Sequence, residues 1–282
     1  MHTSFLRSFK FAALAGSLLL AGACNKDRNQ AEPDTTESAE DASAAEDEAG
    51  GLTDLLDAAA PADFSVANGP VAEPLDLARV LPSCATRTWN PATRTLTLDF
   101  GPTNCTGPNG VAHRGQIVAV FSGGWRQVGS SVAVTLVNYF RNDNQHTGTR
   151  VLAHTGNGSF TLDVQNASVV RPAGTHTWNS QRTYTRLAGQ GTRTIVDDQY
   201  SVTGSASGTN RRGISYTGVI QQPLLKVFAP GCARFFTAGT VLFTNSREKT
   251  LLLNYDPAGT QACDNVASVT CNGRTRTITL GR

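Results

Sequence analysis

The sequence predicts an all-β protein: a large antiparallel domain of many strands, either a β-sandwich or a partly open barrel, after a disordered N-terminal tether. From about residue 75 onward, short stretches rich in Val, Thr, Ile and Phe recur between turn residues. Asn-Gly pairs, which favour tight hairpins, separate several of these stretches. The chain has 27 Gly and one Met, a composition that favours strands and turns over helices. We therefore divide the chain into residues 1–23, 24–74 and 75–282.

The first 23 residues have the features of a secretory signal. Arg7 and Lys10 precede an apolar run from Phe11 to Ala23, which is shorter than the roughly 20 residues that span a bilayer. The ending Leu20-Ala-Gly-Ala-Cys24 resembles a bacterial lipobox, with Ala21 in place of the commoner leucine. This resemblance implies cleavage before Cys24 and lipid on its sulfur, which would anchor the chain to a membrane. An ordinary signal peptide is the alternative.

The segment that follows is strongly acidic. Residues 25–63 carry a net charge of −10, whereas residues 64–282 carry a net charge of +10. Few bulky apolar residues occur before Leu52, so the segment is expected to be a disordered, extended tether. Its acids could also fold back onto the basic domain and compete with anionic ligands. In that case, deleting residues 27–60 would tighten the binding of such ligands.

The strand predictions follow from apolar periodicity. Thr93–Phe100 alternates cleanly, while residues 116–121 and 132–140 are apolar on both faces and are expected to be central strands covered on both sides. Further strands are expected around residues 160–164, 235–243, 251–255 and 275–280. Asn109-Gly110, Asn157-Gly158 and Asn272-Gly273 predict hairpin turns. The total is about a dozen strands, with no amphipathic helix after residue 60.

The cysteine spacing predicts two disulfides. The segment from Cys84 to Cys105 and the segment from Cys232 to Cys263 each contain a cysteine, an alternating strand and a second cysteine just past it. Such pairs can lie about 5.5–6 Å apart in a hairpin. We predict the bridges Cys84–Cys105 and Cys232–Cys263, with Cys271 free. No C-x-x-C occurs, which argues against a zinc ribbon.

One stretch has the composition of a ligand-binding face. Alternation from His176 to Arg186 places Trp178, Arg182, Tyr184 and Arg186 on the same side of a strand, and Trp125-Arg126 is a similar pair. Aromatic planes flanked by arginine suit sugar rings and anionic glycans. Ordinary cross-strand Arg–aromatic pairs on a sheet exterior explain the same pattern.

No catalytic or metal motif emerges. Gly204–Gly208 has Ala206 where a serine hydrolase needs its nucleophile. His113, His146, His154 and His176 have no short ligand spacing and are expected to be exposed. We therefore expect no metal and no cofactor.

Several motifs together form a recognisable pattern. They are Leu96-Thr-Leu-Asp-Phe-Gly with Cys105, Arg114-Gly-Gln-Ile, Val137-Asn-Tyr-Phe with Gly148-Thr-Arg, Gly204-Ser-Ala-Ser-Gly-Thr-Asn with Gly213, and Cys263-Asp-Asn with Asn272-Gly. In this order they resemble a group of uncharacterised lipoproteins of Bacteroidota with a single all-β domain. The resemblance covers roughly residues 84–280 and implies an architecture but no activity. Asn254-Tyr-Asp-Pro257 departs from the more acidic loop expected of the group.

The expected function is that of an outer-membrane-anchored lipoprotein, on the periplasmic or cell-surface side. Its non-enzymatic β domain would be a binding or envelope-structural module for an anionic glycan or a partner protein. The alternative is a secreted, glycan-active hydrolase on a β scaffold, which a deep cleft with convergent acids would favour. No nucleic-acid partner is expected, and the sequence leaves the oligomeric state open.

Overall fold

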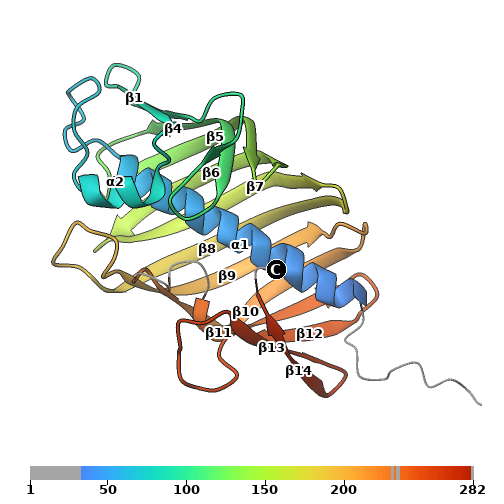
Figure 1. Cartoon of the computed structure of the whole chain (residues 1–282). Coiled ribbons are helices and arrows are strands. Elements are labelled where there is room, and N and C mark those ends of the chain that lie inside the picture. The colour runs from blue at the N-terminus through green and yellow to red at the C-terminus, as the bar shows by residue number, and fades with distance from the viewer. Residues whose placement is uncertain (1–32, 230–231, 233–235, 281–282) are drawn as a thin grey trace, which may run out of the picture. The chain divides into compact units, whose positions relative to one another are not determined.

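The computed structural model describes residues 33–280 except 230–231 and 233–235. Fourteen strands form one antiparallel sheet, in which β3 pairs only with β4 and the others follow in chain order from β1 to β14 (Figure 1). The strands are β1 (Thr86–Asn90), β2 (Thr95–Asp99), β3 (Cys105–Thr106), β4 (Ala112–Phe121), β5 (Ser131–Arg141), β6 (Asn144–Gly156), β7 (Ser159–Arg171), β8 (Gly174–Ala188), β9 (Gln199–Thr209), β10 (Ser215–Val227), β11 (Phe236–Asn245), β12 (Thr250–Asn254), β13 (Val266–Cys271) and β14 (Arg274–Thr279).

The predicted all-β antiparallel class is confirmed, and the sheet is open rather than a two-sheet sandwich. Hairpins of neighbouring strands build it, and Asn157-Gly158 and Asn272-Gly273 form two of the turns with positive φ at both residues. Both predicted disulfides are present, Cys84–Cys105 and Cys232–Cys263, and Cys271 is unpaired and buried.

The prediction of a disordered segment up to residue 74 is wrong for its central part. Residues Pro33–Ala59 form the long helix α1, which crosses one face of the sheet (Figure 1). A seven-residue helix, α2 (Pro74–Val80), follows it, although no helix was expected after residue 60. Helix α1 belongs to the same compact unit as the sheet. An acidic segment that looks unable to form a core by itself is thus ordered by what it packs against.

The expectation that β4 and β5 are covered on both sides is also wrong. Val120 and Val137 are 46% and 41% exposed, whereas Ile117 and Val134 on the other face are buried. Apolar residues occur on both faces of these strands, but only the face toward α1 is covered. An antiparallel sheet with one solvated face tolerates such outward valines.

Two glycines mark β-bulges that bend the sheet. Gly115 in β4 has φ +83°, and a Cβ there would lie 2.0 Å from the Asn138 carbonyl oxygen in β5. Gly148 in β6 has φ +99° and would meet Ala167 of β7 at 2.5 Å. The strand register shifts beside both glycines. Bulges of this kind bend the bulged strand and increase its local twist, which changes the course of the sheet beside α1.

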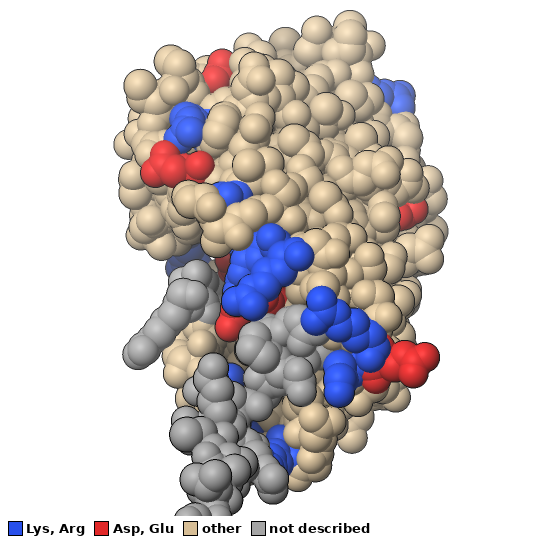
Figure 2. All heavy atoms as spheres, turned by 90° about the vertical axis from the view of Figure 1, so that its right-hand side faces the viewer, with Lys and Arg blue, Asp and Glu red and all other residues tan. Residues whose placement is uncertain are grey.

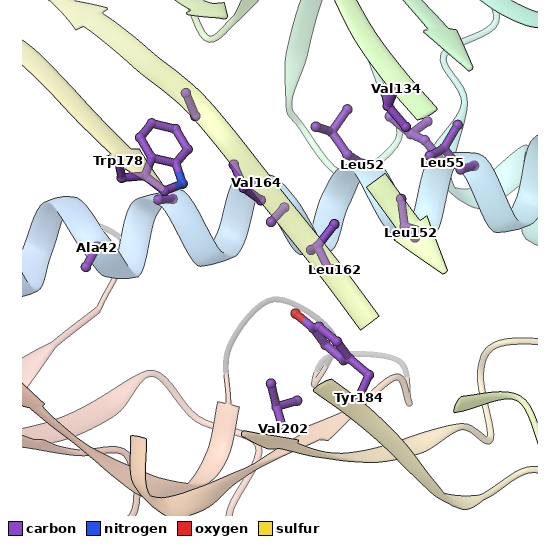
Figure 3. Packing of buried hydrophobic residues seen from close by; sticks show 14 of the residues in the cluster. Ala42, Leu52, Leu55, Val134, Leu152, Leu162, Val164, Trp178, Tyr184 and Val202 are labelled. Carbon is purple, nitrogen blue, oxygen red and sulfur yellow. The ribbon is translucent and has the colours of Figure 1, made fainter. Parts of the chain in front are cut away.

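The apolar core lies between α1 and the sheet. Leu52 and Leu55 of α1 pack in the same cluster as Val134 and Leu152, while Ala42 lies along the half of the helix near Trp178 (Figure 3). Leu56 is 1% exposed, and burying such a side chain contributes about 2 kcal/mol. The C-terminal half of α1 therefore binds the sheet through leucines, and the N-terminal half presents alanines and acids.

The C-terminal end of α1 is fixed to the first edge strand. Arg87 of β1 donates from Nε to the Ala59 carbonyl oxygen at 2.6 Å. A cationic side chain at the last helical carbonyls satisfies an otherwise free acceptor and suits the helix dipole. Asn68, in the segment after α1, pairs with the Trp89 backbone and covers the outer edge of β1.

Candidate functional site

The four predicted ligand-face residues lie together on β8, as the alternation predicted. Trp178, Arg182, Tyr184 and Arg186 share the inner face and are between 3% and 9% exposed. They are not open to solvent, because α1 covers that face. The sequence therefore located a real cluster but not its burial.

Ring stacking orders the aromatic members of this cluster. The Trp178 ring stacks on His176 with centroids 4.8 Å apart, and Tyr184 stacks on Phe160 at 4.6 Å. His176 Nε2 lies 2.8 Å from the Tyr216 hydroxyl. Burial, the largest influence, lowers the pKa of His176 to about 4, so the ring is neutral at pH 7.

Helix α1 meets the sheet through a ladder of ion pairs. Most described acids of the helix contact an arginine from a strand or turn of the sheet. The pairs include Glu37–Arg212 (2.6 Å), Glu40–Arg211, Asp41–Arg171 (2.8 Å), Asp41–Arg211 (2.7 Å), Glu46–Arg182 (2.5 Å), Asp47–Arg141 (2.8 Å), Glu48–Arg150 (2.5 Å) and Asp57–Arg126 (2.9 Å). The predicted folding back of the acidic segment onto the basic domain therefore occurs in its described part, while competition with a ligand is still a prediction.

The pair of Glu48 and Arg150 is the most buried of these. Their side chains are 1% and 2% exposed. Burial acts to raise the pKa of Glu48, but Arg150 and then His146 outweigh it, and the pKa falls to about 2. The His146 ring nitrogen lies 3.7 Å from the carboxylate, too far for a hydrogen bond.

Several buried polar atoms between α1 and the sheet have no hydrogen-bond partner among the described residues. Buried atoms without a hydrogen bond among the described residues include Glu48 Oε2, Asp54 Oδ1, His146 Nδ1 and Arg150 Nε. Burial raises the pKa of Asp54 to about 7, although Lys226 opposes that shift. Each unsatisfied buried polar atom costs about 1–3 kcal/mol, so the helix is bound less tightly than its number of ion pairs implies.

The other predicted Arg–aromatic pair, Trp125-Arg126, lies in the loop between β4 and β5 at the C-terminal end of α1. Trp125 and Arg126 line a cavity of about 330 Å³ together with Phe64 and Arg193, and we call it the Trp125 pocket. The carboxylates of Asp57, Glu73 and Asp76 also line it.

Asp57 holds the wall of the Trp125 pocket in place. Its carboxylate accepts hydrogen bonds from the Trp125 indole nitrogen and from Arg126 Nε, the latter at 3.1 Å. Burial raises the pKa of Asp57 even though Arg126 acts to lower it. Arg126 also contacts Asp198 at 3.2 Å, so one guanidinium joins the helix to the segment before β9.

Behind this pocket, the carboxylate of Asp198 is paired with two buried side chains. Arg186 contacts it directly, and the Tyr200 hydroxyl donates to Oδ2 at 3.1 Å. Burial raises the pKa of Asp198 despite these partners. Arg186, predicted for the ligand face, is therefore committed to Asp198.

The expectation of exposed histidines is wrong. His113, His146, His154 and His176 are each at most 5% exposed and lie on the inner face of the sheet. The signal that could have located them is that each lies on the same side of its strand as apolar residues that are buried. Among the described residues, no group of three or more His, Cys, Asp or Glu could hold a metal ion.

The site residues that the sequence did not indicate are acids of α1, two acids at the start of α2, and Arg193 from a loop. Asp57, the neighbours Glu73 and Asp76, and Arg193 come from three separate parts of the chain and meet only in the fold. The opposite net charges of the two chain segments were the single signal that could have linked the acids to arginines.

Comparisons with protein-family models, with curated proteins and with solved structures found no match. The resemblance to Bacteroidota lipoproteins is still a prediction, and Cys24 lies outside the described residues. The two disulfides indicate an oxidising, extracytoplasmic compartment. In the described part of the chain, no helix is long and apolar enough to cross a membrane.

Proposed function

We propose that this chain is a lipid-anchored protein of the outer membrane whose sheet is a binding module for anionic polymers, with α1 as a built-in competitor. The polymer is an anionic glycan or an acidic segment of an envelope protein. One observation carries the proposal: the inner face of the sheet already binds an acidic chain through arginines from separate strands and turns. An external polyanion would use the same arginines.

The two halves of α1 bind the sheet differently, and this difference would let a polyanion displace the N-terminal half alone. Ion pairs and small buried alanines hold the residues up to Ala49, whereas Leu52, Leu55 and Leu56, with the single pair Asp57–Arg126, hold the rest. Gly50 and Gly51 separate the halves, and each glycine in a helix interior costs about 1 kcal/mol relative to alanine. The N-terminal half can thus leave while the leucine half remains packed.

The arginines that α1 would release can be reached from the solvent. The side chains of Arg171 and Arg211 are 21% and 19% exposed even with α1 in place. On one side of the molecule, basic side chains gather with a few acids among them (Figure 2). A polyanion that approaches such a surface first gains electrostatic attraction and then competes with the acids of α1 for the same guanidiniums.

A lipid anchor on Cys24 would hold the basic face of the sheet near the membrane, where anionic polymers of the envelope lie. Pro33 begins α1 nine residues after Cys24. Nine extended residues span at most about 32 Å, so a lipid on Cys24 would keep the basic face close to the membrane surface. Mass spectrometry of the protein from native membranes tests this part, and an unmodified Cys24 would overturn it.

Hydrogen exchange of the full chain tests the competitor. With dextran sulfate, we expect faster exchange for amides between Thr36 and Ala49, while the amides of β6–β8 stay protected. Uncharged dextran of the same length is the matched control and should change nothing. High salt should abolish the effect, because exposed charges are screened within about 10 Å at 0.1 M. If dextran sulfate leaves the exchange of α1 unchanged, the proposal fails.

The hydrolase alternative has one observation in its favour. Asp57, Glu73 and Asp76 line a single cavity, as paired carboxylates do in glycosidases. However, Asp57 and Asp76 already accept hydrogen bonds from Arg126 and from the Ile195 amide. Release of reducing ends from a polysaccharide panel, lost in Glu73→Gln, would establish this alternative in place of the binding module.

A further inference from the structure

The Trp125 pocket carries an inference that goes beyond anionic polymers and does not rest on them. We propose that this pocket binds a neutral saccharide unit. The pocket lies at the C-terminal end of α1, and the ion-pair ladder occupies mainly the N-terminal half. The two sites are therefore separable by experiment.

The size and the apolar lining of the pocket suit a single sugar ring or a disaccharide. Its volume of about 330 Å³ falls in the range of small-molecule sites. Phe64 and Trp125 contribute aromatic surface, and Ala58, Ala60 and Ala62 leave room beside them. One face of a pyranose ring is apolar, so aromatic rings and small side chains form a fitting wall.

The charges around the pocket favour a neutral ligand over an anion. Asp57, Glu73 and Asp76 bring three carboxylates, against the guanidiniums of Arg126 and Arg193. Asp76 has a further partner in Arg79, at 3.8 Å, so the local charge is balanced. Unlike the inner face of the sheet, this pocket offers an anion no excess of positive charge.

The polar groups that remain can both donate and accept hydrogen bonds. Arg126 uses Nε and Nη2 on Asp57 and Asp198, and its Nη1 donates to no described residue. Arg193 is exposed and forms no ion pair within the described residues. Glu73 is half-buried and supplies acceptor oxygens. Sugar hydroxyls are donors and acceptors at once, which matches this mixed set.

The loop that carries the pocket is held in an unusual conformation. Arg126 has φ +58°, which costs a non-glycine residue of order 1 kcal/mol and must be maintained by its contacts. Those contacts are the two carboxylates of Asp57 and Asp198. Strain of this kind clusters at ligand-binding sites, and here it presents Trp125 to the cavity.

A buried histidine adds an independent observation. His154 is 5% exposed, and neither ring nitrogen has a hydrogen-bond partner among the described residues. It meets the Trp125 ring edge-to-face at 4.8 Å and lines a small adjoining cavity of about 20 Å³. That cavity shares Asp57, Trp125 and Arg126 with the Trp125 pocket. An unpartnered polar side chain behind the aromatic wall is costly for stability alone and fits a site built for a polar ligand.

Saturation-transfer NMR of the full chain carrying Cys24→Ser tests the proposal. The probes are glucose, galactose, N-acetylglucosamine, maltose and cellobiose, with glucuronate and glucosamine as charged counterparts. We expect at least one neutral sugar to bind with a millimolar Kd that about 0.5 M salt leaves unchanged. Trp125→Ala should weaken that binding about tenfold, from the loss of an aromatic contact.

A second variant keeps the test valid if Trp125→Ala fails to fold. Arg193→Ala removes an exposed side chain without an ion pair and should weaken sugar binding severalfold at unchanged stability. Arg276→Ala, an exposed arginine of β14, is the matched control and should bind as the parent does.

Absence of binding by every neutral sugar would overturn the proposal, as would binding of glucuronate alone that is lost in salt. These outcomes are independent of the dextran sulfate experiment, so a failure of one proposal is distinguishable from a failure of the other.

Discussion

Replacing Glu48 by Gln tests whether the ion pairs under α1 stabilise this fold. The Glu48 carboxylate lies 2.5 Å from Arg150, with both side chains almost fully buried. The amide of Gln keeps the size and one acceptor, so the change removes chiefly the charge. It leaves Arg150 buried without its counter-ion.

The magnitude follows from the pKa of Glu48. Arg150 and His146 overcome the opposing effect of burial and lower this pKa from 4.5 to about 2. A difference of that size corresponds to about 3 kcal/mol of folding free energy. Because the folded-state pKa is the lower one, the stabilisation is complete above pH 4.5 and is lost as the pH falls through about 2.

Denaturant unfolding of the parent and the Glu48→Gln variant, repeated from pH 7 down to pH 2, measures this contribution. We expect the variant to be about 3 kcal/mol less stable at pH 7 and the two curves to converge toward pH 2. Glu40→Gln is the matched control. Glu40 is 52% exposed in its pair with Arg211, and such surface pairs contribute at most about 1 kcal/mol.

Two results would refute the reasoning. One is a loss below about 1 kcal/mol at pH 7, and the other is a loss that does not change with pH. A double variant with Glu48→Met and Arg150→Met separates charge from packing, since apolar side chains of similar volume often replace a buried ion pair without loss. Recovery of stability in the double variant would assign the cost of Glu48→Gln to the unpaired charge of Arg150.

Four further outcomes are expected, each measured by thermal or denaturant unfolding unless stated. Gly50→Ala should stabilise the fold by about 1 kcal/mol, because alanine has the higher helix propensity and the added Cβ fits, its nearest atom being Lys226 Nζ at 3.6 Å. The same variant should weaken dextran sulfate binding, and an unchanged stability would contradict the role given to Gly50 as a weak point of α1. Gly115→Ala should destabilise by more than about 2 kcal/mol, because its Cβ would clash with the backbone of β5. Leu56→Ala should cost about 2–5 kcal/mol, and a cost under 1 would place Leu56 outside the core. The Cys271 thiol should react with a thiol reagent only after unfolding, as it is 5% exposed.

Local pattern was sufficient for much of the sheet. Alternation on β8 placed Trp178, Arg182, Tyr184 and Arg186 on one face because side chains of a strand point to opposite sides with a period of two. The Asn-Gly pairs located three hairpins, β3–β4, β6–β7 and β13–β14, and in the last two both turn residues have positive φ, which few other residues adopt. The spacing of strands and cysteines was likewise enough to pair Cys84 with Cys105 and Cys232 with Cys263.

Local pattern does not predict an element whose partner is distant in sequence. Residues 33–59 give only a weak helix signal, since the inward stripe of the N-terminal half consists of small alanines, Ala39, Ala42, Ala45 and Ala49, set among like-charged acids. Glu48 and Arg150 are 102 residues apart, and the helix forms because such arginines neutralise its acids. The inward histidines were misplaced for a related reason: burial of a strand face depends on what covers it.

By itself, the sequence determined the class of fold, the hairpins, the disulfides and the shared face of the arginines and aromatics, because each depends on backbone periodicity or on short spacings. Only the tertiary structure decided that α1 occupies that face and that Trp125, Arg126 and Arg193 surround a pocket with Asp57 and Glu73. Charge compensation and cavity shape are sums over residues from distant parts of the chain, and no local pattern contains them.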